Sequence, residues 1–66
     1  MTVTANGKQY QLPEGAKLPE LLELRNMSIN SVAVWLNGRQ PMYAEYEDLV
    51  LHEGDELKLY YMCIGG

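Results

Sequence analysis

The sequence predicts an α+β fold in which one helix lies across one face of a mixed sheet of four to five strands. Two Asn-Gly pairs, Asn6-Gly7 and Asn37-Gly38, each lie between strand-like segments and predict hairpin turns. One short stretch, residues 18–25, has its apolar side chains at helical spacing. Residues 56–62 then predict a last strand with one buried and one exposed face.

The length and charge of the chain restrict what it does. Its 66 residues make one small domain. A domain of this size buries only about 60% of the surface that its unfolded chain exposes, so we expect no deep catalytic pocket and no enzyme activity of its own. The formal net charge is −4, and the five basic residues are scattered along the chain. Phosphate backbones would be repelled, so we expect no nucleic acid, and a protein partner with a basic surface is favoured.

The single cysteine, Cys63, excludes an internal disulfide. Small secreted domains usually contain several disulfides. No apolar run reaches the roughly 18–20 residues that span a membrane, and residues 1–4 lack the basic flank of a secretion signal. We therefore expect a cytoplasmic protein without a membrane partner.

The first half of the chain predicts a hairpin followed by a helix. Residues 1–6 and 8–12 alternate on either side of Asn6-Gly7, and Pro13-Glu14-Gly15 ends the second arm. The helix begins near Pro19, which suits a first turn, and ends near Asn26-Met27. The apolar residues at helical spacing are Leu18, Leu21, Leu22 and Leu24. A helix this short is not stable alone, so it must lie on a sheet.

The second half predicts a further hairpin and a last strand. Residues 31–36 are apolar on both faces, which favours a central or doubly covered strand. Pro41 limits the returning arm to a short or edge segment. We expect a turn or a single helical turn at residues 43–48, a brief strand at 49–51 and a turn at 52–55.

The most economical packing places the last strand in the centre of the sheet, parallel to the first, which is the β-grasp arrangement. We expect this domain to cover residues 1–62. In the last strand Leu57, Leu59 and Tyr61 would face the helix, and Glu56, Lys58, Tyr60 and Met62 would face away. Tyr60 and Met62 would then form an exposed apolar patch for partner docking, with candidate neighbours Ala33, Val34 and Val50.

The sequence closes on Gly65-Gly66, directly after the last predicted strand. Glycine has no Cβ, so such a segment passes through a channel that is too narrow for a side chain. We expect residues 63–66 to be a flexible tail and the carboxylate of Gly66 to be the working group. A frayed terminus without a function is the alternative.

Other candidate residues favour structural roles. Cys63 is a small apolar residue without a neighbouring cation to activate its thiol, although persulfide or mixed-disulfide chemistry remains an alternative. His52 lacks the companion ligands of a metal site, so we expect no metal and an exposed turn histidine. The acidic residues Glu45, Glu47 and Asp48 favour a solvated surface. Trp35 fits partner docking and packing in the sheet equally well.

Several motifs, in this order, resemble the ThiS/MoaD superfamily of ubiquitin-like sulfur carriers. They are the Asn6-Gly7 turn, Leu21-Leu22 in a short helix, Val32-Ala33-Val34 leading to Leu36-Asn37-Gly38, Gly54-Asp55-Glu56 before the last strand, and Gly65-Gly66. The resemblance covers essentially the whole chain. The absence of insertions makes its length more similar to the thiamine-biosynthesis branch than to the longer molybdopterin-synthase subunits.

The resemblance implies a sulfur carrier that serves partner enzymes and binds no cofactor itself. An adenylating enzyme of the ubiquitin-activating type uses ATP to transfer AMP to Gly66, and a sulfur donor protein converts the adenylate to a thiocarboxylate. Ile64, Gly65 and Gly66 enter the partner's active site, and thiazole synthase accepts the sulfur in thiamine biosynthesis. Residues 39–42 and Cys63 depart from the thiamine-carrier pattern. Sulfur transfer to molybdopterin or amino-acid synthesis, a ubiquitin-like protein modifier, and a subunit with an inert tail therefore remain alternatives.

Overall fold

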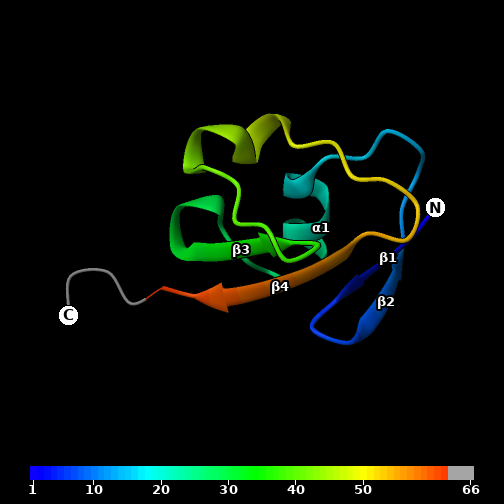
Figure 1. The fold of residues 1–66 in the computed structure, drawn as a ribbon, viewed down its shortest axis with the longest axis horizontal. Helices are drawn as coiled ribbons and strands as arrows, with labels where there is room; N and C mark the ends of the chain where they lie inside the picture. The colour runs from blue at the N-terminus through cyan, green and yellow to red at the C-terminus, as the bar shows by residue number, and fades with distance from the viewer. Residues whose placement is uncertain (63–66) are drawn as a thin grey trace.

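The computed structural model describes residues 1–62, and Figure 1 shows their fold. The elements in chain order are β1 (Thr2–Ala5), β2 (Lys8–Gln11), α1 (Leu18–Leu24), the 3₁₀ helix η1 (Ile29–Ser31), β3 (Val32–Leu36), the 3₁₀ helix η2 (Tyr43–Asp48) and β4 (Glu56–Tyr61). Among the described residues, no helix is long and apolar enough to cross a membrane.

The four strands form one mixed sheet in the order β2-β1-β4-β3. β1 pairs antiparallel with β2, and β3 pairs antiparallel with β4. β4 lies beside β1 in parallel orientation. Helix α1 and the two 3₁₀ helices lie on one side of the sheet (Figure 1). The predicted β-grasp arrangement, with the last strand central and parallel to the first, is confirmed.

Both predicted Asn-Gly turns are present. Asn6 and Gly7 have φ angles of 51° and 83°, and Asn37 and Gly38 have 50° and 82°. Two successive positive φ angles are the signature of the type I′ turn, whose twist matches that of the flanking strands. The second turn is followed by a single bridge between Leu36 and Arg39, so the returning arm is short, as Pro41 predicts.

Helix α1 begins where its sequence predicts. Pro19 occupies the first turn, and the Lys17 backbone N–H donates to Glu20 Oε2 at 2.9 Å, which satisfies a free donor at the helix start. Leu18, Leu21 and Leu22 are buried, but Leu24 is 60% exposed. The prediction that Leu24 shares the buried stripe is wrong, because it lies two residues past Leu22 and points off the stripe.

The end of α1 is a Schellman motif. Asn26 has a φ of 57°, and its N–H donates to the Glu23 carbonyl at 3.1 Å. The Met27 N–H donates to the Leu22 carbonyl at 2.9 Å. These two bonds satisfy carbonyls that the helix would otherwise leave free. The predicted end near Asn26-Met27 is thereby confirmed.

Strand β3 lies at an edge of the sheet and Trp35 on its outer face is 38% exposed, so the expectation of a central or doubly covered strand for residues 31–36 is wrong. Its outer edge is covered by other means. The Val34 N–H donates to the Tyr46 hydroxyl at 3.2 Å, and the Leu36 N–H donates to the Arg39 carbonyl at 2.7 Å. The bond to Tyr46 of η2 thus satisfies a backbone donor at the outer edge, which a fifth strand would otherwise have to do.

The brief strand expected at residues 49–51 is reduced to a single bridge between Lys17 and Val50. Two backbone bonds flank it, from Leu18 N–H to the Leu49 carbonyl and from Leu51 N–H to the Ala16 carbonyl, both 2.8 Å long. The segment is bonded to the start of α1, so it does not join the sheet. The helical turn expected at residues 43–48 is confirmed as η2.

We predict that Tyr46→Phe destabilises the protein by about 1–3 kcal/mol, because the buried Val34 N–H loses its acceptor. Tyr46 is 4% exposed, so water does not easily replace the hydroxyl. The matched control is Tyr43→Phe, which removes a hydroxyl from a residue that is 58% exposed and should change stability by less than about 0.5 kcal/mol. Urea unfolding measures both variants, and equal losses would contradict this account.

Candidate functional site: the open face of the sheet

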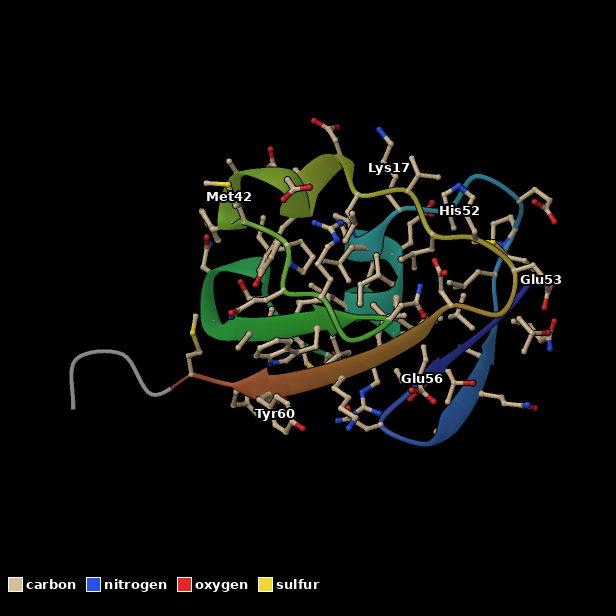
Figure 2. All side chains as sticks on the ribbon, viewed as in Figure 1. Lys17, Met42, His52, Glu53, Glu56 and Tyr60 are labelled. Carbon is tan, nitrogen blue, oxygen red and sulfur yellow. The ribbon has the colours of Figure 1, made fainter. Side chains whose placement is uncertain are left out.

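The side chains of β4 separate onto the two faces of the sheet. Leu57 and Leu59 are buried under α1, while Glu56, Lys58 and Tyr60 are exposed. Figure 2 shows Glu56 and Tyr60 on the side of β4 that faces away from the helices. The predicted alternation is confirmed for these residues. Tyr61, expected to face the helix, lies opposite the fully buried Val32 but is itself 71% exposed, so it is not part of the core.

Strand β3 supplies the neighbours of these exposed residues. Ala33 lies opposite Tyr60, and Trp35 lies opposite Lys58. Directly opposed residues of an antiparallel pair share a face, so these four form one surface, here called the open-face patch. Trp35 is 38% exposed, so it packs partly on the sheet and partly faces solvent.

Two of the three residues that were predicted to neighbour Tyr60 and Met62 do not lie in the open-face patch. Val34 lies opposite Leu59 and is fully buried, because the period of two in a strand assigns it to the core face. Val50 is 38% exposed, but it bridges Lys17 at the start of α1 and is not part of the sheet. Ala33 alone of the three candidates lies in the patch. Trp35 and Lys58, which were not assigned to the patch, complete it.

The open face is hollowed on both sides of the exposed ridge of β4. One hollow, of about 360 Å³, is lined by Trp35, Gly38, Glu56, Lys58 and Tyr60. The other, of about 520 Å³, is lined by Asn6, Gly7, Glu56, Leu57, Lys58 and Tyr60. Glu56, Lys58 and Tyr60 line both.

Tyr60 and Met62, the predicted docking residues, are both exposed, by 53% and 43%. Tyr60 lies in the open-face patch, whereas Met62 does not line either hollow. The Met62 N–H donates to the Ser31 carbonyl at 3.0 Å, so the chain is held to the start of β3 up to the last described residue. Ile64, Gly65 and Gly66, predicted to enter a partner, and Cys63 lie outside the described residues.

The acidic residues of η2 lie on the surface, as expected. Glu45 Oε2 accepts from the Met42 N–H at 2.7 Å, and Glu45 Oε1 lies 3.9 Å from Arg39. Asp48 accepts from the Lys17 ammonium at 3.3 Å. Glu45 thus closes the first turn of η2, and Asp48 links η2 to the segment before α1. These are structural contacts.

His52 lies in an exposed turn, as predicted, with 77% of its side chain accessible. Its neighbour Asp55 is largely buried and accepts hydrogen bonds from the His52 N–H at 2.8 Å and the Asn37 side-chain amide at 2.9 Å. Within residues 1–62, no three His, Cys, Asp or Glu side chains gather closely enough to hold a metal ion. Asp55 therefore has a structural role that the sequence did not reveal.

Comparison with solved structures connects this geometry to known proteins. The crystal structure of the thiamine biosynthesis protein ThiS from Geobacter metallireducens matches with a TM-score of 0.77 and 29% identity, over 100% of both chains. A solution NMR structure of a thiamine biosynthesis protein from the same organism matches with a TM-score of 0.74 and 28% identity, over 100% of this chain and 88% of that one. The chain is ThiS-like. No protein-family model and no curated protein matches it.

The ThiS-like fold supports the resemblance to the ThiS/MoaD superfamily that the motifs indicated. It also accounts for the mixed four-stranded sheet with one α-helix. In this chain two exposed aromatic side chains, Trp35 and Tyr60, lie on the sheet face that no helix covers.

We predict that substitutions of two adjacent residues of β4 destabilise the protein to very different extents. Leu59→Ala should cost about 2–5 kcal/mol, because Leu59 is 3% exposed and packs in the core. Tyr60→Thr should cost less than about 1 kcal/mol, because Tyr60 is half exposed and threonine keeps a high strand propensity. Chemical denaturation measures both. A larger loss for Tyr60→Thr than for Leu59→Ala would show that Tyr60 is a core residue and not part of an open surface.

Proposed function

We propose that this protein is a sulfur carrier whose C-terminal Gly66 is adenylated and then converted to a thiocarboxylate, which donates sulfur to thiazole formation in thiamine biosynthesis. The observation that carries the proposal is the likeness to ThiS over the full length of both chains, together with Gly65-Gly66 at the end of the sequence. The protein is small and acts as substrate and shuttle, so catalysis belongs to its partners. We assign it to the cytoplasm.

The chemistry explains why a carrier needs a partner with ATP. A carboxylate is a poor acyl donor, because its negative charge resists attack by a nucleophile. In the proposed reaction, a Gly66 carboxylate oxygen attacks the α-phosphorus of ATP and pyrophosphate leaves. A persulfide sulfur of the donor protein then attacks the acyl carbon and AMP leaves. Reductive cleavage of the resulting acyl disulfide by a thiol leaves the thiocarboxylate.

The folded domain makes each of these steps an oriented encounter. The open-face patch offers an aromatic anchor, Tyr60, close to the end of β4, and Met62 lies exposed just beyond it. Aromatic anchors contribute most of the binding energy of many interfaces. We propose that the adenylating enzyme contacts Tyr60 and Met62 while Ile64, Gly65 and Gly66 enter its active site. Thiazole synthase would then take the same tail.

We predict that deletion of Gly66 abolishes the pyrophosphate release that the adenylating enzyme carries out with this protein and ATP. A strand-like residue spans about 3.3 Å, so the shortened tail would hold its carboxylate too far from the α-phosphorus. Unfolding of the variant in urea should be unchanged. A shortened chain that is adenylated at the normal rate would exclude Gly66 as the working residue.

Cys63→Ser is the matched control within the same tail. We propose that the carboxylate, and not the thiol, carries sulfur, so this variant should still form the thiocarboxylate. Loss of thiocarboxylate with normal adenylation would instead assign Cys63 to the sulfur transfer step. Stable covalent adducts on other proteins, in place of a thiocarboxylate, would favour the protein-modifier alternative.

We predict that Tyr60→Thr raises the KM of the adenylating enzyme for this protein by about tenfold, which corresponds to a loss of about 1.4 kcal/mol of binding energy. The kcat should change little, because Tyr60 does not touch the reacting atoms. Leu24→Gln is the control, since Leu24 is similarly exposed, by 60% against 53% for Tyr60, but lies on α1, on the other side of the sheet. Equal effects of the two variants on KM would argue against docking on the open face.

A further inference from the structure

Strand β4 is held on one side by the side chain of Asn6. The Asn6 amide Nδ2 donates to the Leu59 carbonyl at 2.9 Å, and Asn6 Oδ1 accepts from the Leu59 N–H at 2.8 Å. The backbone ladder between β1 and β4 pairs Thr4 with Glu56 and Ala5 with Leu57, and it ends with the bond from the Asn6 N–H to the Leu57 carbonyl at 3.0 Å. The side chain of Asn6 therefore takes the place of a further backbone pair and continues the ladder to the middle of β4.

The side chain of Asn37 performs the same task at the other end of the strand. Its Oδ1 accepts from the Glu56 N–H at 2.9 Å, and its Nδ2 donates to Asp55 Oδ1, also at 2.9 Å. Asn37 reaches these groups from the turn that follows β3. In each amide both the oxygen and the nitrogen are therefore hydrogen-bonded, and each amide bonds at least one backbone group of β4.

Each of these asparagines precedes a glycine, and this pair has a specific reactivity. The backbone nitrogen of the following residue attacks the side-chain carbonyl carbon, and a side chain on that residue would hinder the approach. Apart from its two chain neighbours, no residue crowds either glycine, because a Cβ built on Gly7 or Gly38 would meet no other atom within 4 Å. Gly7 and Gly38 also line the two open-face hollows, so water reaches both turns.

We propose that Asn6 and Asn37 are deamidation sites that the folded state protects by holding their amides on β4, and whose conversion releases that strand. The glycine nitrogen loses its proton and bonds to Cγ, the Cγ–Nδ2 bond breaks, and ammonia leaves with that proton. Water then opens the cyclic imide to an aspartyl or an isoaspartyl residue. No oxidant or reductant is needed, and water is the only co-reactant.

The aspartyl and isoaspartyl products cannot make all the hydrogen bonds that the two amides make. An aspartate at position 37 would oppose its carboxylate to that of Asp55, where the amide now donates, and two like charges at this distance repel. An aspartate at position 6 would face the Leu59 carbonyl without a proton to donate. An isoaspartyl link would also lengthen the backbone within a two-residue turn. Each change removes support from β4.

The protection is tested on the wild-type protein in mildly alkaline buffer, with and without denaturing urea, by peptide mapping. Asn26 and Asn30, which precede Met27 and Ser31, are internal controls. We expect Asn6 and Asn37 to deamidate readily in urea, much more slowly in the folded protein, and faster than the controls in urea. Equal rates in the folded and unfolded protein would overturn the proposal.

The consequence is tested with Asn37→Asp, which mimics the product, and with Asn30→Asp as its matched control. Asn30 accepts through Oδ1 from the Tyr43 hydroxyl, and aspartate preserves that acceptor. We expect Asn37→Asp to lower the Tm clearly more than Asn30→Asp does. If Asn37→Asp fails to fold, the wild-type rates still decide on protection. A Tm for Asn37→Asp equal to that of the control would overturn the release of β4.

Discussion

The central strand must be bonded on both sides, and in this protein the backbone alone does not achieve it. β1 and β4 share a register of only two residue pairs before the first hairpin turns away, and β3 leaves the sheet at Leu36. At the first place the Asn6 side chain supplies both a donor and an acceptor to Leu59, and at the second the Asn37 side chain supplies an acceptor to the Glu56 N–H. Because Asn is also well suited to positive φ, one residue type forms each turn and holds the strand beside it. The positions of β4 and its exposed side chains depend on these contacts.

This arrangement separates the two tasks of the protein between the faces of one strand. Leu57 and Leu59 join the core under α1, and Lys58 and Tyr60 between and beyond them are exposed, on the face where we propose that the partner docks. The strand leads towards the C-terminal residues, and the Met62 N–H is still bonded to the Ser31 carbonyl. A rigid approach to the tail suits a carrier, because a partner that binds the open face receives the following residues from a defined starting point. The small core is sufficient for this purpose.

Local signals in the sequence predicted most of the fold. The Asn-Gly turns, the start and end of α1 and the alternation in β4 each follow from short-range chemistry, so they were predictable. Contacts between distant segments of the chain could not be predicted in this way. The cover of β3 by Tyr46, the burial of Val34 and the bond between Asn37 and Asp55 depend on tertiary packing. The alternation within β4 was enough to predict that Lys58 and Tyr60 face away from the helix, whereas Trp35 was placed beside them only once the register between β3 and β4 was known.

The central claim is that Gly66 carries sulfur as a thiocarboxylate while the folded domain presents it. The most direct measurement is the fragment mass spectrum of the intact protein after incubation with its adenylating enzyme, ATP and a sulfur donor. We expect the exchange of one oxygen for sulfur, located on the C-terminal Gly66, and its disappearance when ATP is omitted. An unchanged mass under conditions in which a known ThiS is converted, or sulfur on Cys63 alone, would contradict the claim.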